Sequence, residues 1–243
     1  MTRYDYVFMA VAGAAATASS AAAQDARRVT YQPSYEGRCA DCALSESRMS
    51  FWNLQGAHFP GADFSHAKLN NVHAQGVDFS KSTAHGGDFS FALLNSANFS
   101  GANLEEASFF KAQALGADFS GSNLKTATLT DGVFVSVNFE GVVADGARAR
   151  GADFSGANFT GALLRRARLR QAVYDGAILT ATVLENADIA GASFQDARLY
   201  DANFSGASGY ETASFDGACR SEAALLPVGI DLPLCAPIST AVN

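Results

Sequence analysis

The chain has 243 residues, enough for one long domain or two short ones, and its formal net charge is −7 at pH 7. That mild acidic balance favours solubility and gives no reason to expect nucleic-acid binding. Apolar residues make up 48% of the chain. Ala dominates them and β-branched residues are scarce, which is unusual for an ordinary sheet protein.

Residues 1–23 have the pattern of an export signal. Arg3 and the terminal amine precede an apolar run over 7–16, and residues 21–23 provide an A-x-A cleavage site before Gln24. The run is too short to span a bilayer, and no later stretch is a transmembrane candidate. We therefore expect a periplasmic or secreted protein; the alternative is a disordered Ala-rich arm. A polar lead-in follows over 24–38.

The rest of the chain is dominated by a five-residue repeat. Thirty-four pentads run in constant phase from the one centred on Leu44 to the one centred on Gly209. Phe or Leu occupies most of the centres, Ala usually stands two places earlier, and Asp or Asn often lies between them. Ala97, Asn98 and Phe99 are one example of this pattern.

A period of five fits neither a straight helix nor a straight strand. On a helix, positions five apart lie about 140° apart, so the large residues would spiral around the surface. On a strand, an odd step sends them to opposite faces. A backbone that turns once in every pentad keeps both the Ala and the large centre inside. The repeat therefore predicts a solenoid whose coils hydrogen-bond along its axis.

A spacing of twenty residues gives the cleanest vertical columns, which indicates four sides per coil. One column is an unbroken aromatic ladder, and its members are Phe59, Phe79, Phe99, Phe119, Phe139 and Phe159. A surface column alternates in sign through Glu105, Lys125, Asp145, Arg165 and Glu185, so each charge should lie between opposite charges. Another outward column, formed by Asp78, Asn98, Asp118, Asn138 and Asn158, predicts amide hydrogen bonds along the axis.

Over roughly residues 42–218 the sequence resembles the pentapeptide-repeat family. The shared pattern is a small residue, Asp or Asn, a Leu or Phe centre, then Ser or Thr and often Gly. The resemblance implies an all-β fold, a right-handed quadrilateral parallel β-helix of about eight to nine coils. We assign residues 39–218 to this β-helix and 219–243 to a carboxyl-terminal cap and tail.

The pattern changes at the carboxyl-terminal end. Residues 207–212 form a hexad that shifts the phase by one position, and Phe215 resumes the pattern in the new register. Residues 221–226 then have the composition of one short helix with a Ser cap, ended by Pro227. We expect this helix and the Pro-containing tail to cover the end of the solenoid.

Four cysteines lie in two pairs at opposite ends of the predicted rod. Four cysteines allow three connectivities, but the coil estimate separates the two ends by about 40 Å at ~4.8 Å per coil. This leaves Cys39 paired with Cys42 and Cys219 paired with Cys235, as suits an oxidising compartment. The same separation excludes a four-cysteine zinc site. A thioredoxin-like redox role for the first pair lacks the βαβ context.

The sequence offers little for catalysis. Of the four histidines, only His66 and His85 could approach one another, and no further metal ligands accompany them. No glycine-rich phosphate loop precedes a helix. We therefore expect no catalytic residues, no metal and no cofactor.

One surface feature suggests binding. At twenty-residue spacing Arg148 stacks on Arg168 and Arg150 stacks on Arg170, with Arg166 nearby and Asp188 at the border. Like charges about 5 Å apart repel unless an anion lies between them. The four stacked arginines are a candidate patch for an acidic partner, a polysaccharide or a lipid headgroup; the alternative is a solvated face partly neutralised by Asp188.

The first functional hypothesis is a non-enzymatic, exported β-solenoid that acts as a rigid structural or protein-interaction scaffold in the periplasm or cell envelope. Its partner would be an unknown protein or envelope component, with no nucleic acid expected and a homodimer possible. The resemblance also implies an alternative, a DNA-mimicking protein that interacts with DNA gyrase. The export signal, the modest charge and the arginine cluster disfavour that alternative. An enzyme is a third hypothesis.

Overall fold

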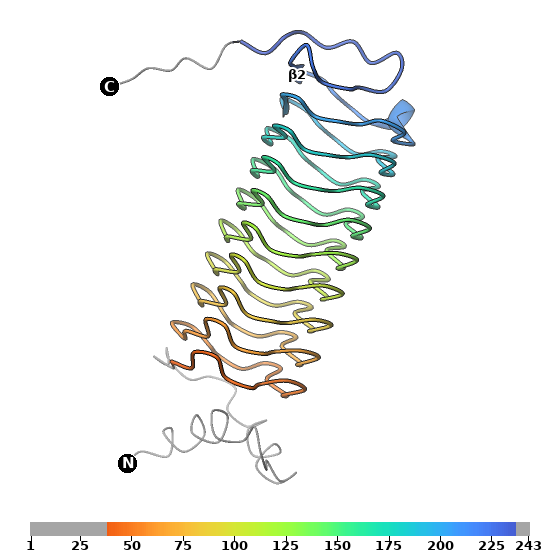
Figure 1. Ribbon diagram of the computed structural model, residues 1–243. Coiled ribbons are helices and arrows are strands. Elements are labelled where there is room, and N and C mark those ends of the chain that lie inside the picture. The colour runs from red at the N-terminus through yellow and green to blue at the C-terminus, as the bar shows by residue number, and fades with distance from the viewer. Residues whose placement is uncertain (1–37, 237–243) are drawn as a thin grey trace, which may run out of the picture.

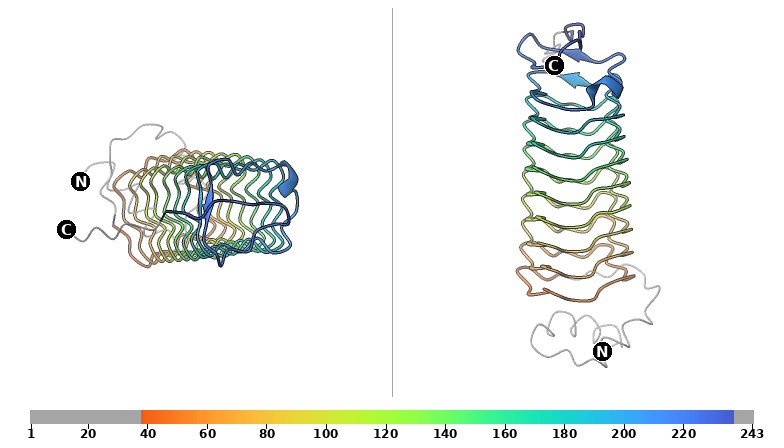
Figure 2. Two further views of the ribbon diagram at one scale, coloured as in Figure 1. Left: turned by 90° about the horizontal axis from the view of Figure 1, so that it is seen from above. Right: turned by 90° about the vertical axis from the view of Figure 1, so that its right-hand side faces the viewer.

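The computed structural model describes residues 38–236, which wind into a single rod (Figure 1). Parallel β-bridges join residue n to residue n+20 without interruption from Arg38↔His58 to Asp188↔Ser208. The fold is the predicted right-handed quadrilateral β-helix, with four pentads in each coil. Figure 2 shows the coils stacked one on another along the whole rod. The predicted signal over 1–23 and nearly all of the lead-in lie outside the described residues.

Each pentad supplies one corner of the square. Every fifth residue from Asp41 to Gly206 has a positive φ, close to the left-handed helical region, whether or not it is glycine. The two inward residues of the pentad flank an outward one, and each corner connects them to the next side. This single left-handed residue per pentad is the turn that the five-residue period requires.

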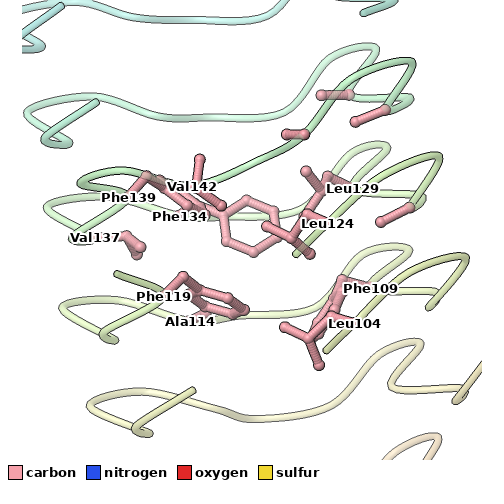
Figure 3. Packing of buried hydrophobic residues seen from close by; sticks show 14 of the residues in the cluster. Leu104, Phe109, Ala114, Phe119, Leu124, Leu129, Phe134, Val137, Phe139 and Val142 are labelled. Atoms are coloured by element: carbon pink, nitrogen blue, oxygen red, sulfur yellow. The ribbon is translucent and has the colours of Figure 1, made fainter. Parts of the chain in front are cut away.

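The core is a narrow column of stacked side chains (Figure 3). The predicted phenylalanine ladder is continuous, and successive rings from Phe59 to Phe159 stack with centroids 5.9, 4.9, 4.8, 5.3 and 4.8 Å apart. Rings from other sides meet the ladder edge to face, as Phe109 does with Phe119 at 5.5 Å. Ala at the small position lets these large side chains from facing walls fill the shaft.

The carboxyl-terminal end departs from the twenty-residue register. The last three residues of the hexad form the short 3-10 helix η2 (Tyr210–Thr212), after which Ser193 bridges Ser214, at a spacing of 21 residues. Strand β1 (Arg198–Leu199) then pairs in parallel with β2 (Cys219–Arg220) at the same spacing. The predicted one-residue phase shift is therefore present, and η2 accommodates the extra residue.

The helix predicted over 221–226 is wrong. Leu225 instead bridges Asn203, donating its N–H to the carbonyl of Ala202 while its own carbonyl accepts the N–H of Phe204. The chain then goes round once more in a shorter coil, and Leu234 bridges Arg220 in parallel (Figure 1). A six-residue helix is marginal by itself, whereas the last coil offers unpaired strand groups that this segment satisfies. The cap is thus a continuation of the β structure.

Both predicted disulfides are present. Cys39 and Cys42 close the first turn of the rod, and Cys219 and Cys235 join β2 to the segment that bridges it in parallel. Within residues 38–236, no helix has both the length and the apolar character that crossing a bilayer demands.

Candidate functional site

Four arginines project from one face of the rod, two from each of two adjoining coils. We call Arg148, Arg150, Arg168 and Arg170 the arginine patch. Arg148 and Arg168 are β-bridge partners, and all four side chains are exposed. The structure thus brings together the four residues that the sequence selected. The patch exists because residues two apart in the same extended side both point outward.

The arginine patch is only partly neutralised. Arg170 Nη1 lies 3.4 Å from Asp188 Oδ2, and Arg150 Nε donates to Gln171 Oε1 at 3.3 Å. Within residues 38–236, Arg148 and Arg168 have no carboxylate within 4.0 Å of their guanidinium groups. An anion bound between these two groups would relieve their mutual repulsion.

The neighbouring corner shows what a neutralised arginine looks like in this rod. Arg165 lies 3.5 Å from Asp145 and 3.6 Å from Glu185, one coil below and one coil above. The alternating column predicted from the sequence therefore forms ion pairs around Arg165. In the column of Arg148 and Arg168 the next residue is Asp188, but its carboxylate pairs with Arg170. The same fold that balances the charge of Arg165 thus leaves Arg148 and Arg168 without a carboxylate within 4.0 Å, so the fold itself does not require the imbalance.

The outward Asp and Asn column forms hydrogen bonds along the axis. Asn98 Nδ2 donates to Asp78 Oδ1 at 3.2 Å, and Asn138 Nδ2 donates to Asp118 Oδ1 at the same distance. The carboxylate of Asp78 also accepts the backbone N–H of Ser80, as Asp118 does for Ser120. These oxygens accept hydrogen bonds from the backbone at the corners and from the Asn side chains of the next coil. The Asp and Asn column therefore has a structural role that does not require a bound ligand.

The histidines do not assemble a metal centre. The rings of His66 and His85 meet edge to face with centroids 5.4 Å apart, as the sequence allowed, and His85 Nε2 lies 3.9 Å from Glu106 Oε2. No group of three or more His, Cys, Asp or Glu side chains within the described part of the chain could hold a metal ion.

Sequence reasoning missed two features. Tyr174 occupies a large-centre position, but its hydroxyl is buried without a hydrogen-bond partner, and desolvation by burial strongly raises the pKa of that hydroxyl. It lines a small cavity, about 10 Å³, beside the undersized centres Ala144 and Ala149. The second feature is an outward-facing aromatic pair, the exposed Phe91 and the half-buried Phe110, with ring centroids 5.4 Å apart. Phe91 and Phe110 lie two places and one place after the centres of their pentads, where the repeat usually has small or polar residues. Large aromatic residues at those positions were the sequence signal that could have revealed the pair.

The family model described as pentapeptide repeats matches residues 47–83, 88–125, 133–171 and 175–208 in eight copies. The chain belongs to the pentapeptide-repeat family. Pentapeptide-repeat proteins are generally structural or interaction proteins. No curated protein shows significant sequence similarity to the chain.

Several solved pentapeptide-repeat structures are similar to this chain. A trypsin-treated variant of QnrB1, a plasmid-mediated fluoroquinolone resistance protein, is 20% identical with a TM-score of 0.39, and the match covers 68% of this chain and 91% of QnrB1. A protein from the thylakoid lumen of Arabidopsis thaliana is 34% identical with a TM-score of 0.23, covering 51% and 66%. Rfr23 from the cyanobacterium Cyanothece 51142 is 20% identical with a TM-score of 0.23, covering 54% and 91%.

Proposed function

We propose that this pentapeptide-repeat protein is an exported, non-enzymatic interaction scaffold whose arginine patch binds an acidic partner. The observation that carries the proposal is the pair Arg148 and Arg168, which are bridge partners with no carboxylate within 4.0 Å of either guanidinium group. Asp188, the bridge partner of Arg168 on the next coil, forms its ion pair with Arg170 instead. A β-helix fixes such rows of side chains on a rigid surface, so little ordering of the backbone opposes binding. Arginine suits this role because its planar fork binds carboxylates and phosphates bidentately.

Two features support export to the periplasm or cell envelope. Residues 1–23 have the pattern of a cleaved signal. The four cysteines form two disulfides, which persist in oxidising compartments. Mass spectrometry of the protein from fractionated cells tests this part: we expect a periplasmic or secreted chain that begins at Gln24. A chain with intact Met1 in the cytosol would overturn it.

Affinity capture from the native envelope tests the binding role. The variant changes Arg148, Arg150, Arg168 and Arg170 to Ser, and we expect it to lose the acidic partner that the unmodified protein retains. A matched control removes four other exposed positive charges, by changing Arg48, Lys81, Lys125 and Arg198 to Ser. Equal retention of the partner by both variants and the unmodified protein would contradict the proposal.

DNA gyrase is the alternative partner, and it requires a different surface. A protein that imitates DNA must present regularly spaced negative charge, whereas this face presents neighbouring arginines. A supercoiling assay separates the two roles. We expect no effect of the protein on gyrase, and inhibition or protection of gyrase would favour the alternative.

A further inference from the structure

A second group of outward-facing side chains lies near the arginine patch; Phe91 and Lys111 are exposed and Phe110 is half-buried. Phe91 is 47% exposed and packs edge to face against Phe110, with an interplanar angle of 89°. Lys111 Nζ lies 5.2 Å from the centroid of the Phe110 ring. We call Phe91, Phe110 and Lys111 the aromatic corner. These residues point away from the shaft, so packing of the core does not account for them.

The aromatic corner and the arginine patch share one vertical edge of the rod. Backbone hydrogen bonds link the coils along that edge: Phe91 N–H donates to the Phe110 carbonyl, and Lys111 N–H donates to the Thr130 carbonyl. In the next two coils the Asp131 N–H donates to the Arg150 carbonyl, and the Gly151 N–H donates to the Arg170 carbonyl. The edge from Phe91 to Arg170 spans four coils, about 19 Å at the spacing of hydrogen-bonded strands.

Asp131 is the only acidic side chain at this corner between Phe91 and Arg170, and it is exposed. It separates the aromatic corner from Arg150, one coil further along. Its carboxylate would repel a polyanion that follows the edge, so it provides a test whose expected direction is a gain of binding.

We propose that this edge binds an extended acidic polysaccharide that lies along the rod axis, which rests on the proposed binding role of the arginine patch. Carboxylates on the sugars would pair with the guanidinium groups of Arg148, Arg150, Arg168 and Arg170. The apolar C–H face of a sugar ring would lie on the exposed face of Phe91. An extended polymer reaches both sites at once, which raises its affinity over that of a short fragment.

The geometry favours a polysaccharide over a single-stranded nucleic acid. Nucleic-acid grooves offer aromatic platforms on which successive bases stack. Here the two rings are perpendicular, and the Lys111 ammonium group lies over Phe110. A single exposed ring face suits one sugar better than a run of stacked bases.

The test measures binding of the full-length mature protein to polygalacturonate by calorimetry, with a neutral dextran and single-stranded DNA as competitors. We expect polygalacturonate to bind in preference to both. The double variant Phe91→Ser/Phe110→Ser should bind about tenfold more weakly, as should Arg148→Ser/Arg168→Ser. Lys81→Ser/Lys125→Ser, which removes two exposed charges elsewhere, should bind normally. Asp131→Asn should bind more tightly.

The outcomes separate this inference from the proposed function. If the phenylalanine variant binds polygalacturonate normally, or if DNA competes better than the polysaccharide, the polysaccharide inference is overturned. In that case an arginine variant that still loses its envelope partner leaves the proposed function standing. If the arginine variant loses neither polygalacturonate nor an envelope partner, both fail. Circular dichroism of each variant checks that the rod is intact.

Discussion

The body of the rod and its carboxyl-terminal cap are held together in different ways. From residue 38 to 206 every coil repeats the same bridges, the same inward pattern and the same corners. Beyond residue 207 the register shifts to 21 and then 22 residues, and specific contacts replace the pattern. A disulfide joins Cys219 to Cys235, Tyr200 Oη donates to the Ala236 carbonyl, and Ser221 hydrogen-bonds to Asp201.

The comparison shows that extending a solenoid and ending it place different demands on the chain. In the body each coil buries its large residues against the equivalent positions of the coils beside it, so stability is a sum of repeated contacts. The last coil has a neighbour on one side only, and the chain must cover it with a segment that has no repeat. Changes in the body should therefore affect the whole rod, whereas changes in the cap should affect mainly its end.

The largest expected effect comes from the body. Phe119 is fully buried between Phe99 and Phe139, with ring centroids at 4.8 and 5.3 Å. Phe119→Ala should lower the free energy of unfolding by about 3–5 kcal/mol, because the surrounding rings cannot close the cavity. Denaturant unfolding measures the change. Phe91→Ala is the control, since it removes a half-exposed ring whose edge-to-face contact with Phe110 is worth about 0.5–1.5 kcal/mol. A loss below about 1 kcal/mol at Phe119 would mean that the ladder bears little of the packing.

Removing the disulfide of the cap should lower the free energy of unfolding by about as much as the smallest cavity-creating substitutions in the core. Changing Cys219 and Cys235 to Ser reopens a loop of 17 residues, for which the loop-entropy model gives about 3 kcal/mol. We expect hydrogen exchange to rise in residues 219–236 while the body keeps its protection. The matched change at Cys39 and Cys42 opens a much shorter loop and should cost about 2 kcal/mol in the same model. Uniform loss of protection along the rod would contradict a separate cap.

A backbone position in the cap gives the next effect. Gly209, with φ of 76°, precedes η2, and a Cβ placed there would lie 2.5 Å from the Ala190 Cβ and 2.7 Å from its backbone N and Cα. Gly209→Ala should therefore lower stability by roughly 2 kcal/mol, from the left-handed conformation and the clash with a neighbouring backbone. Thermal unfolding measures it. Gly116→Ala is the control, because it shares the positive φ but has open space around it. If the two variants lose the same stability, the left-handed backbone conformation alone explains the loss at Gly209, and the clash with Ala190 contributes nothing.

The sequence predicted the body far better than the cap, and the reason is physical. In the body one local rule recurs in every coil, so Phe99 and Phe119 could be placed one above the other from spacing alone. At 221–226 the local pattern favoured a helix, but Leu225 hydrogen-bonds to the open edge of the preceding coil. That edge belongs to residues more than twenty positions away, so no local pattern could reveal it.

The candidate site divides in the same way. The arginine patch follows from the twenty-residue period, because outward residues in one column must be neighbours. The aromatic corner was not predicted, because Phe91 and Phe110 lie off the phase of the large centres and on different columns. Their contact depends on how two adjoining corner positions, one and two places after the centre, meet across a coil boundary.

The smallest expected effect, at neutral pH, concerns Tyr174 in the body. Its hydroxyl is buried without a partner among the described residues, so Tyr174→Phe removes a desolvated polar group and should leave stability unchanged or raise it by about 1 kcal/mol. Burial raises the pKa of this hydroxyl above its ordinary value of 10.0, and the charged form is the deprotonated one. The unfolded chain therefore releases this proton first as pH rises.

The sign of the pH dependence follows from that order. Below about pH 10 the Tyr174 hydroxyl keeps its proton in both states and adds no pH dependence. Above about pH 10 the unfolded state binds fewer protons, so this group should lower the stability of the unmodified protein by about 1.4 kcal/mol per pH unit. Tyr174→Phe should lack that increment, while Tyr200→Phe, at a half-buried surface tyrosine, should keep it. Urea unfolding between pH 9 and about 11.5 measures the difference. Parallel curves for the unmodified protein and Tyr174→Phe would show that water reaches this hydroxyl, and that the shaft beside Ala144 and Ala149 opens more readily than the close-packed ladder around Phe119.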